Sequence, residues 1–411
     1  MNSFNRRDFV KSAGAISIAG ATAGVGLSGC ASVGGAAKPK VVIVGGGFGG
    51  ATAAKYIAMW SEGKIDVTLV ERGSAFVSCP LSNLVLGGSK SIGDISVAYG
   101  GLDKYGIKRV QGEATGFDAD KKVLALADGT RLPYDRLILS PGIDFMLESL
   151  PGLSSAEARG KVLAAWKAGP ETVALRNQLT AMKDGGVFAI HIPKAPFRCP
   201  PGPYERACQV AWYFQQAKPK SKVLILDANE DVVSKKGLFM AAWNGKFKGV
   251  VEYRNNQEIQ DVDAKTNTLK MTFGDDLRAD VLNVLPPMRA GNIATQNGLN
   301  NSNKRWCQID WLTYESTAVK NVHILGDSLQ IAPLMPKSGH MANQHGKVCA
   351  AAVVALLMGD VVNTTPMVAN TCYSFIDDKN VVHVASVHRY DAAQKTRSEE
   401  HTSELQSQNA I

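Results

Sequence analysis

The stretch that decides the fold lies near the start of the chain and reads Lys40-Val-Val-Ile-Val-Gly-Gly-Gly-Phe-Gly-Gly50. Its β-branched residues are typical of a short buried strand, which runs directly into the pattern Gly45-x-Gly47-x-x-Gly50 and then into a helix. A second strand over residues 65–71 ends in Glu71. Glycines let the backbone approach a pyrophosphate, the helix N-terminus attracts anions, and Glu71 can accept hydrogen bonds from ribose hydroxyls. Together these features predict a dinucleotide-binding α/β domain.

Two later strands favour FAD over NAD as the dinucleotide. The first runs from Tyr134 and ends in a tight turn at Gly142, and the second runs from Asn321 to Gly326-Asp327. In two-domain flavoproteins, a strand of the first kind closes the FAD domain. A strand of the second kind places its Asp on the ribityl chain of the flavin.

Between these strands, the sequence predicts a second strand–turn–helix–strand unit. Strands at 186–193 and 222–227 flank a helix at 204–216, but prolines and Cys199 occupy the turn where a pyrophosphate-binding loop needs glycines. We therefore expect a second Rossmann-like domain that binds no nucleotide, and an electron donor other than a nicotinamide.

The predicted fold class is α/β, with two Rossmann-like dinucleotide-binding-type domains and a small C-terminal interface domain. The FAD domain is expected to be discontinuous. The expected boundaries are 1–37 for a signal peptide, 38–151 and 285–362 for the two parts of the FAD domain, 152–284 for the second domain, 363–396 for a truncated C-terminal domain and 397–411 for a non-native tail.

The composition of the 411 residues excludes a disulfide-stapled miniprotein, a collagen and a disordered chain. The net charge of +8 is spread without a long basic run, so nucleic-acid binding gains little support. His340 and His345 lack further ligands at metal-binding spacing, and we expect no metal site.

The N-terminus reads as an export signal. Arg6-Arg7 precede an uncharged stretch at 12–29 that is too rich in Gly and Ala to favour a membrane span. The pair resembles a twin-arginine signal, which implies a periplasmic protein exported with its cofactor in place. Leu27-Ser-Gly-Cys30-Ala resembles a lipoprotein box, so Cys30 is either acylated or removed by cleavage a few residues later.

The C-terminus from about Arg397 onward is polar and does not continue the apolar alternation of Val381 to Val387. It resembles the translation of a sequencing-adapter read-through. We expect these residues not to be native, which resequencing of the locus would test.

Seven motifs together resemble the flavoprotein subunit of flavocytochrome c sulfide dehydrogenase, within the glutathione-reductase-like superfamily. The resemblance covers residues 38 to about 390. The motifs are 41–50, Cys79-Pro-Leu-Ser-Asn83, Cys199-Pro-Pro-Gly-Pro-Tyr-Glu-Arg206, 286–291, Gly326-Asp327, Met335-Pro-Lys-Ser338 and Asn370-Thr-Cys-Tyr373.

The resemblance implies a role for individual residues. Cys79 would carry FAD through a thioether, the alternative being a half-buried structural cysteine. Cys199 and Cys372 would form a redox disulfide that hydrosulfide attacks, leaving a persulfide and a thiolate. Glu205 would manage protons, although a charge in the first turn of a helix is a serious structural alternative. The expected cofactor-binding residues are Gly45, Gly47, Phe48, Gly50, Glu71, Arg72, Cys79, Gly142, Asp327 and Lys337.

Lys337 has a second expected role, in catalysis. With the N-terminus of the helix that begins at Gly339, its charge would stabilise the anionic reduced flavin. A solvated surface residue is the alternative. Cys208, Cys307 and Cys349 match none of these motifs and are expected to be buried, inert thiols.

The implied activity is oxidation of hydrosulfide to sulfane sulfur, with electrons passing singly to a c-type, dihaem cytochrome subunit. The chain has no Cys-x-x-Cys-His motif and is expected to attach no c-type haem itself. The first alternative is a sulfide:quinone oxidoreductase, and the second is a non-catalytic flavin electron relay or reactivating partner in sulfur oxidation. Family members continue with an aromatic-rich segment where this chain has the suspect tail.

Overall fold

The computed structural model describes residues 37–408, with side chains as far as residue 405. The predictions that rest on Arg6, Arg7 and Cys30 lie outside the described residues. The unit that begins at Lys38 holds all the elements below.

Five parallel strands form the first sheet, in the order β19-β9-β1-β2-β5. Their bounds are β1 Lys40–Val44, β2 Asp66–Glu71, β5 Lys108–Gln111, β9 Arg136–Leu139 and β19 Val322–Ile324. The central strands are continuous apolar runs because both faces of a parallel sheet are covered. Strand β19 joins this sheet after the chain has built the second domain, so the predicted discontinuous FAD domain is confirmed.

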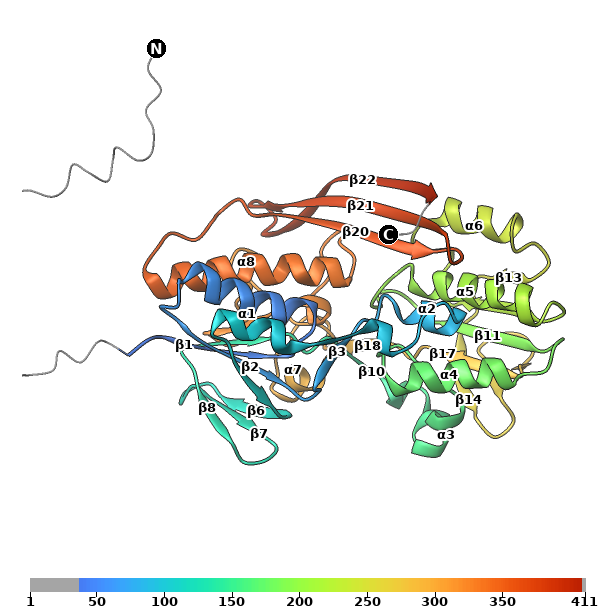
Figure 1. Cartoon of the computed structure of the whole chain (residues 1–411), viewed down its shortest axis with the longest axis horizontal. Coiled ribbons are helices and arrows are strands. Elements are labelled where there is room, and N and C mark those ends of the chain that lie inside the picture. Colours follow the sequence, from blue (N-terminus) through green and yellow to red (C-terminus); the bar gives the residue numbers. More distant parts are fainter. Residues whose placement is uncertain (1–36, 409–411) are drawn as a thin grey trace, which may run out of the picture. The chain divides into compact units, whose positions relative to one another are not determined.

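Helices α1 (Phe48–Trp60) and α8 (Gly339–Met358) pack against each other beside this sheet (Figure 1). Asn343 Nδ2 donates to Thr52 Oγ1 across the pair at 2.7 Å. Ser338 caps α8, because its Oγ accepts a hydrogen bond from the backbone N–H of Met341 at 3.0 Å. This cap fixes where α8 begins.

A second, four-stranded parallel sheet has the order β13-β12-β11-β17. Its strands are β11 Val187–Ile192, β12 Lys222–Asp227, β13 Val251–Arg254 and β17 Val281–Val284. Helix α5 (Gly202–Ala217) joins β11 to β12 and packs on the sheet, which confirms the predicted second Rossmann-like unit. Strands β10 (Ile143–Phe145) and β18 (Met288–Ala290) pair antiparallel in the segments that lead into and out of this domain.

The C-terminal sheet consists of the antiparallel strands β20 (Met367–Phe375), β21 (Asn380–Asp391) and β22 (Thr396–Gln408). Strand β20 contacts both α8 and α5, and Figure 1 shows the three strands in red passing from α8 towards α6 (Lys236–Asn244). The sequence predicts no element beyond residue 396, whereas the structure places residues 396–408 in β22. Their origin outside the native gene stays a prediction.

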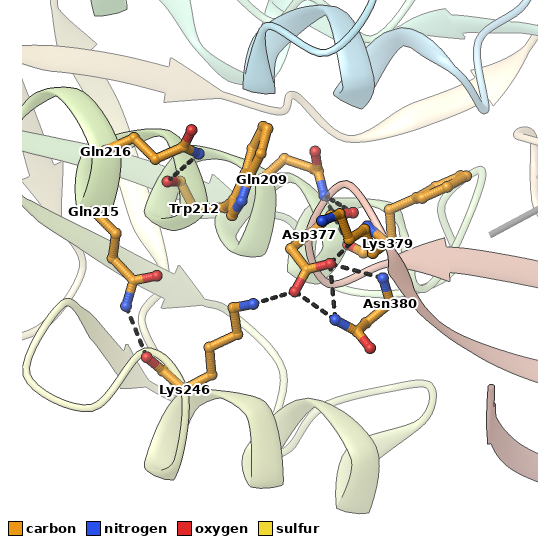
Figure 2. A network of polar contacts seen from close by, with 9 residues as sticks. Gln209, Trp212, Gln215, Gln216, Lys246, Asp377, Lys379 and Asn380 are labelled. Atoms are coloured by element: carbon orange, nitrogen blue, oxygen red, sulfur yellow. Dashed lines mark hydrogen bonds and ion pairs between the residues drawn. The ribbon is translucent and has the colours of Figure 1, made fainter. Parts of the chain in front are cut away.

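A polar network anchors the turn between β20 and β21 onto the second domain (Figure 2). Asp377 is buried and accepts hydrogen bonds from the backbone N–H groups of Lys379 and Asn380 at 2.8 and 2.7 Å. It also forms an ion pair with Lys246, and Gln209 of α5 donates to the carbonyls of Phe375 and Asp377 at 3.2 Å each. This end of β20 is therefore fixed to α5.

The remaining elements lie around the two main sheets. The helices are α2 Ser82–Gly87, α3 Ala156–Lys161, α4 Pro170–Ala181 and α7 Asn292–Gln296; the strands are β3 Ala75–Val77, β4 Ser96–Ala98, β6 Ala114–Asp118, β7 Val123–Leu126, β8 Arg131–Pro133, β14 Ile259–Asp263, β15 Thr268–Met271 and β16 Leu277–Arg278. Within residues 37–408, no helix combines the length and apolar character needed to cross a bilayer.

Candidate active site

A cavity of about 640 Å³ is lined by residues of both Rossmann-like domains. Such a volume lies in the range of small-molecule and cofactor sites. Most of the predicted cofactor-binding residues line it, namely Gly45, Gly47, Phe48, Glu71, Arg72, Cys79, Gly142 and Asp327. Cys199 and the first residue of α8, Gly339, line the same cavity.

The glycine-rich loop has the shape that a pyrophosphate site needs. Gly45 has a φ of 97°, and a Cβ there would lie 2.4 Å from the Ser140 carbonyl oxygen. A Cβ on Gly50 would lie 1.9 Å from the Gly45 carbonyl oxygen, so only glycine permits this approach of helix and strand. Gly47, in contrast, faces open space. Gly50 therefore shapes the loop without lining the cavity.

Two carboxylates of the cavity fit the ribose and ribityl positions expected for FAD. Glu71 Oε2 and Oε1 accept hydrogen bonds from the N–H groups of Gly46 and Gly73 at 2.6 and 2.9 Å, which holds the carboxylate beside the loop. Asp327 Oδ1 is buried without a partner, as a group that awaits a ligand hydroxyl would be. Burial raises the pKa of Asp327, against the lowering effect of Arg198 and Lys337. These residues fit FAD.

Cys79 lies at the second-domain side of this cavity, just before α2. Its Sγ accepts a hydrogen bond from the Ala168 N–H at 3.2 Å and lies 3.6 Å from Arg198 Nη2. The thiol is half-buried and free. Its side chain is therefore directed at the cavity and held by donors, which is compatible with the predicted attachment to the flavin.

The Cys79 and Cys199 motifs are joined by Asn83 and Arg206. Asn83 Nδ2 donates to the Gly202 carbonyl at 3.2 Å, and Asn83 Oδ1 accepts from Arg206 Nε at 3.1 Å. The buried Arg206 guanidinium also donates to the carbonyls of residues 164 and 165. The two motifs, far apart in sequence, thus form one rigid wall.

Cys199 lies in the turn before α5 with a φ of 59°, a conformation that non-glycine residues rarely adopt. Its N–H donates to the Lys337 carbonyl at 2.8 Å, and its own carbonyl accepts from the Gly202 N–H at 2.9 Å. Burial raises the pKa of the Cys199 thiol; Cys372 and Glu205 raise it further, whereas Arg198 and Lys235 lower it. The strained turn thus places the Cys199 thiol where these four side chains affect its pKa.

Cys372 is on β20, outside the residues that line the large cavity. Its Sγ lies 3.4 Å from Asn370 Oδ1, which also accepts from Ser338 Oγ, the cap of α8, at 2.6 Å. Both Cys199 and Cys372 are free thiols in the structure. The redox disulfide therefore stays a prediction, supported by the effect of Cys372 in raising the pKa of Cys199.

Glu205 is in the first turn of α5 and is only 3% exposed. Its Oε1 is buried without a hydrogen-bond partner. Burial raises the pKa of this carboxyl to about 7, against the lowering effect of a backbone hydrogen bond at Phe375 and of the Lys235 ammonium. A carboxyl with a pKa near neutral pH can hold or release a proton, and its place in the first turn of α5 also suits a charge favoured by the helix dipole, so both roles stay predictions.

Lys337 does not line the large cavity. Its ammonium donates to the carbonyls of Asp327, at 3.0 Å, and Leu329, and lies 3.8 Å from the centre of the Trp306 ring. Burial lowers the pKa of Lys337 to about 7. The residue as a whole is only partly buried, so the alternative of a surface lysine stays a prediction beside the catalytic role. Its predicted action on the flavin stays a prediction; what it supplies here is the carbonyl that holds Cys199.

Three residues of the site were not predicted from the sequence: Trp166, Arg198 and Lys235. Trp166 and Arg198 line the cavity, and Trp166 Nε1 donates to the Arg198 carbonyl at 3.2 Å. Arg198 directly precedes Cys199, so its place next to a predicted catalytic residue could have identified it from the sequence. Trp166 and Lys235 have no sequence signal, because only tertiary folding brings them to the site.

Three family models match the chain and agree with this geometry. A family model described as pyridine nucleotide-disulphide oxidoreductase matches residues 39–174. The central region of the sulfide dehydrogenase (flavocytochrome c) flavoprotein chain matches residues 172–286, and the flavin-binding region of flavocytochrome c sulphide dehydrogenase matches residues 364–411. Fold and family models place the chain in the class of pyridine nucleotide-disulphide oxidoreductases. Within it, the chain belongs to the family of flavocytochrome c sulfide dehydrogenase flavoprotein chains.

Individual relatives support the same assignment. A flavoprotein chain of flavocytochrome c sulfide dehydrogenase from Chlorobaculum thiosulfatiphilum is 59% identical over 46 residues, which cover 11% of this chain and 94% of that sequence. A mitochondrial sulfide:quinone oxidoreductase from Dictyostelium discoideum is 25% identical over 298 residues. That match covers 70% of this chain and 65% of the relative's own length.

Solved structures share the fold. The sulfide:quinone oxidoreductase from Aquifex aeolicus superposes with a TM-score of 0.70 at 16% identity, covering 90% of this chain and 87% of that one. The reductase in a covalent putidaredoxin reductase–putidaredoxin complex gives a TM-score of 0.64 at 19% identity, covering 86% and 82%.

Proposed function

We propose that the chain is an FAD-dependent sulfide dehydrogenase, which oxidises hydrosulfide to sulfane sulfur through a redox disulfide between Cys199 and Cys372. The observation that carries the proposal is the position of Cys199, which lines the flavin-type cavity. Cys372 and Glu205 both raise the pKa of its thiol. When bound, FAD accepts two electrons and can release them singly.

The protein's own step is an exchange of sulfur–sulfur bonds. Hydrosulfide attacks one sulfur of the disulfide, a new S–S bond forms, the Cys199–Cys372 bond breaks, and the second cysteine leaves as a thiolate. The negative charge of hydrosulfide is thereby transferred to that thiolate. Glu205, with its pKa near neutral, is placed to take the proton from the persulfide or to supply one to the thiolate.

A Cys199→Ser variant tests this step. The proposal expects sulfide to bleach the flavin absorption of the wild-type protein and to leave that of the variant essentially unchanged. Cys208→Ser is the matched control, since it alters a buried thiol that accepts a hydrogen bond from Trp243 Nε1. The flavin of this variant should bleach as that of the wild type does. Bleaching of Cys199→Ser at the wild-type rate would contradict the mechanism, and absence of bleaching in the wild type would favour an electron relay.

Covalent attachment of FAD at Cys79 is part of the same proposal. Support comes from the thiol's place in the cavity wall and from the donors that orient it. After denaturation in SDS, mass spectrometry should find FAD on the peptide that contains Cys79, and a Cys79→Ala variant should release all of its flavin. Quantitative release of FAD from the wild type would refute the attachment.

For the electron acceptor we propose a c-type cytochrome subunit in the periplasm, reached after twin-arginine export. The name of the family, flavocytochrome c sulfide dehydrogenase, and the paired arginines at the N-terminus support this assignment. The similarity to sulfide:quinone oxidoreductases favours a quinone as the second candidate. Sulfide-dependent reduction of a c-type cytochrome should exceed that of decylubiquinone, and the reverse preference would select the quinone enzyme.

A further inference from the structure

Lys235 is a buried cation that the mechanism above does not use. It directly precedes α6, has a φ of 56° and is only 1% exposed. Its Nζ donates to the Cys372 carbonyl at 2.7 Å, to Ser374 Oγ at 2.8 Å and to the Val382 carbonyl at 3.4 Å. All three ammonium protons therefore point to β20 and β21.

These three acceptors are neutral. No carboxylate among residues 37–405 forms an ion pair with Lys235 within 4.0 Å. Burial lowers the pKa of Lys235, and the groups that oppose this effect are Cys372, Glu205, Cys199 and Glu404. The carboxylate of Glu404 accepts a hydrogen bond from the backbone N–H of Lys235 rather than from its ammonium.

A buried charge without a counterion is costly to a fold. Here the neighbours include both cysteines of the proposed redox pair. Opening the disulfide moves one negative charge from hydrosulfide onto a cysteine thiolate, which adds an anion near the Lys235 ammonium, whose direct hydrogen-bond acceptors are all neutral. The Lys235 ammonium should therefore stabilise the opened pair, which carries a negative charge, more than the neutral disulfide.

The position of β20 also depends on this lysine. The network around Asp377 fixes the end of the strand to α5, the helix that carries Glu205. Lys235 holds the same strand at Cys372 and Ser374, two contacts that reach it from the second domain. Lys235 therefore adds an anchor at Cys372 itself, beyond the one at the end of the strand.

We propose that Lys235 is a positioning residue of the cysteine pair: its buried ammonium holds the backbone of Cys372 and balances the negative charge that the pair acquires when hydrosulfide opens the disulfide. The inference rests on the proposed function. The charge sets the redox equilibrium of the pair, and the hydrogen bonds set the place of the strand.

The test uses the full, flavin-containing protein and compares Lys235→Met with Lys236→Met. Lys236 is the matched control, since its exposed ammonium pairs with Asp231 at the surface. Each protein is equilibrated in dithiothreitol redox buffers and quenched with an alkylating agent, and the reduced fraction of Cys199 and Cys372 is read by mass spectrometry. We expect the equilibrium constant for reduction to fall about tenfold in Lys235→Met, about 30 mV for a two-electron couple. Lys236→Met should stay within about twofold of the wild type.

Two further variants separate charge from anchoring and protect the test against misfolding of Lys235→Met. Lys235→Gln keeps a donor and removes the charge, so it should shift the equilibrium as Lys235→Met does. Ser374→Ala removes one acceptor and keeps the charge, so it should shift the equilibrium less than twofold. An unchanged equilibrium in a folded Lys235 variant, or a tenfold shift in Ser374→Ala, would overturn the proposal.

The wild-type protein separates failure of this inference from failure of the proposed function. If its oxidised form contains no Cys199–Cys372 disulfide, or if sulfide does not bleach its flavin, the proposed function fails. If both are observed and the Lys235 variants behave as the wild type, only the role of Lys235 is rejected.

Discussion

At the residue scale, the Glu205 carboxyl is deeply buried, and its Oε1 has no hydrogen-bond partner. Burial raises its pKa to about 7, while the same carboxyl in an unfolded chain titrates near about 4.3. The folded protein therefore keeps this proton over a pH range in which the unfolded chain has lost it. Folding stability attributable to Glu205 falls as pH rises through this range and is constant above it.

Glu205→Gln should remove this dependence. We expect the free energy of unfolding of the wild type, relative to that of the variant, to decrease between about pH 4.3 and pH 7, as measured by urea unfolding. The ratio of sulfide-dependent bleaching rates, wild type over variant, should also change near pH 7. The ratio is the proper readout because sulfide itself titrates in this range and affects both proteins alike. Flat differences in both measurements would show that Glu205 is not the titrating group.

The strand–turn–helix unit at the start of the FAD domain depends on one contact at the scale of the element. A Cβ on Gly50 would overlap the Gly45 carbonyl oxygen, so Gly50→Ala must push α1 away from β1. We expect a loss of stability of about 1–3 kcal/mol and a loss of bound flavin, measured by thermal unfolding and by the ratio of flavin to protein absorption.

Gly47→Ala is the control for this element, since a Cβ at Gly47 meets no protein atom within 4 Å. The stability of its flavin-free form should equal that of the flavin-free wild type. Equal melting temperatures of flavin-free Gly50→Ala and Gly47→Ala would contradict the role given to the contact.

The β20–β21 turn is stabilised by the charge of Asp377. Burial alone would raise the pKa of Asp377, but the hydrogen bonds from Lys246, Lys379 and Asn380 outweigh burial and lower it. A carboxylate with a lowered pKa stabilises the fold above its unfolded pKa of about 3.9, and this contribution is lost as pH falls through its folded value.

Asp377→Asn should therefore destabilise the protein by about 1–3 kcal/mol at pH 7, and the difference from the wild type should shrink below about pH 4. Urea unfolding at both pH values measures it. Lys379→Ala is the control, because the exposed side chain of Lys379 takes no part in the contact, which uses its backbone N–H. A deficit of Asp377→Asn that persists unchanged at pH 3 would contradict an electrostatic origin.

For the whole molecule, the parts predicted from the sequence are those whose signal is local. The loop from Gly45 to Gly50, the strand that ends in Glu71 and the helix after Cys199 each follow from contiguous residues, and the two Rossmann-like domains follow from their order. The proposed pairing of Cys199 with Cys372 follows from no local pattern, because Cys372 lies on β20, whose contacts with α8 and α5 are set by tertiary folding. Only the resemblance to a family supplied that pair.

Other features escaped the sequence for the same physical reason. In the sequence, Lys235 looks like one half of an exposed lysine pair. The residues next to it in the chain give no sign of its contacts with β20 and β21, which lie more than 130 positions away. Residues 396–408 lack apolar alternation, yet they pair with β21, and the buried Arg397 side chain donates to the carbonyls of Pro366 and Trp311. The hydrogen bonds of the Lys337 ammonium to the carbonyls of residues 327 and 329 likewise have no local signal, and its action on the flavin stays a prediction.

The most direct test of the account is a peptide map of the oxidised wild-type protein before and after one equivalent of sulfide. The account predicts a disulfide-linked pair of peptides that contain Cys199 and Cys372, and conversion of that pair by sulfide into one persulfide and one free thiol. Two unlinked thiols in the oxidised protein, or a disulfide that sulfide leaves intact, would contradict it.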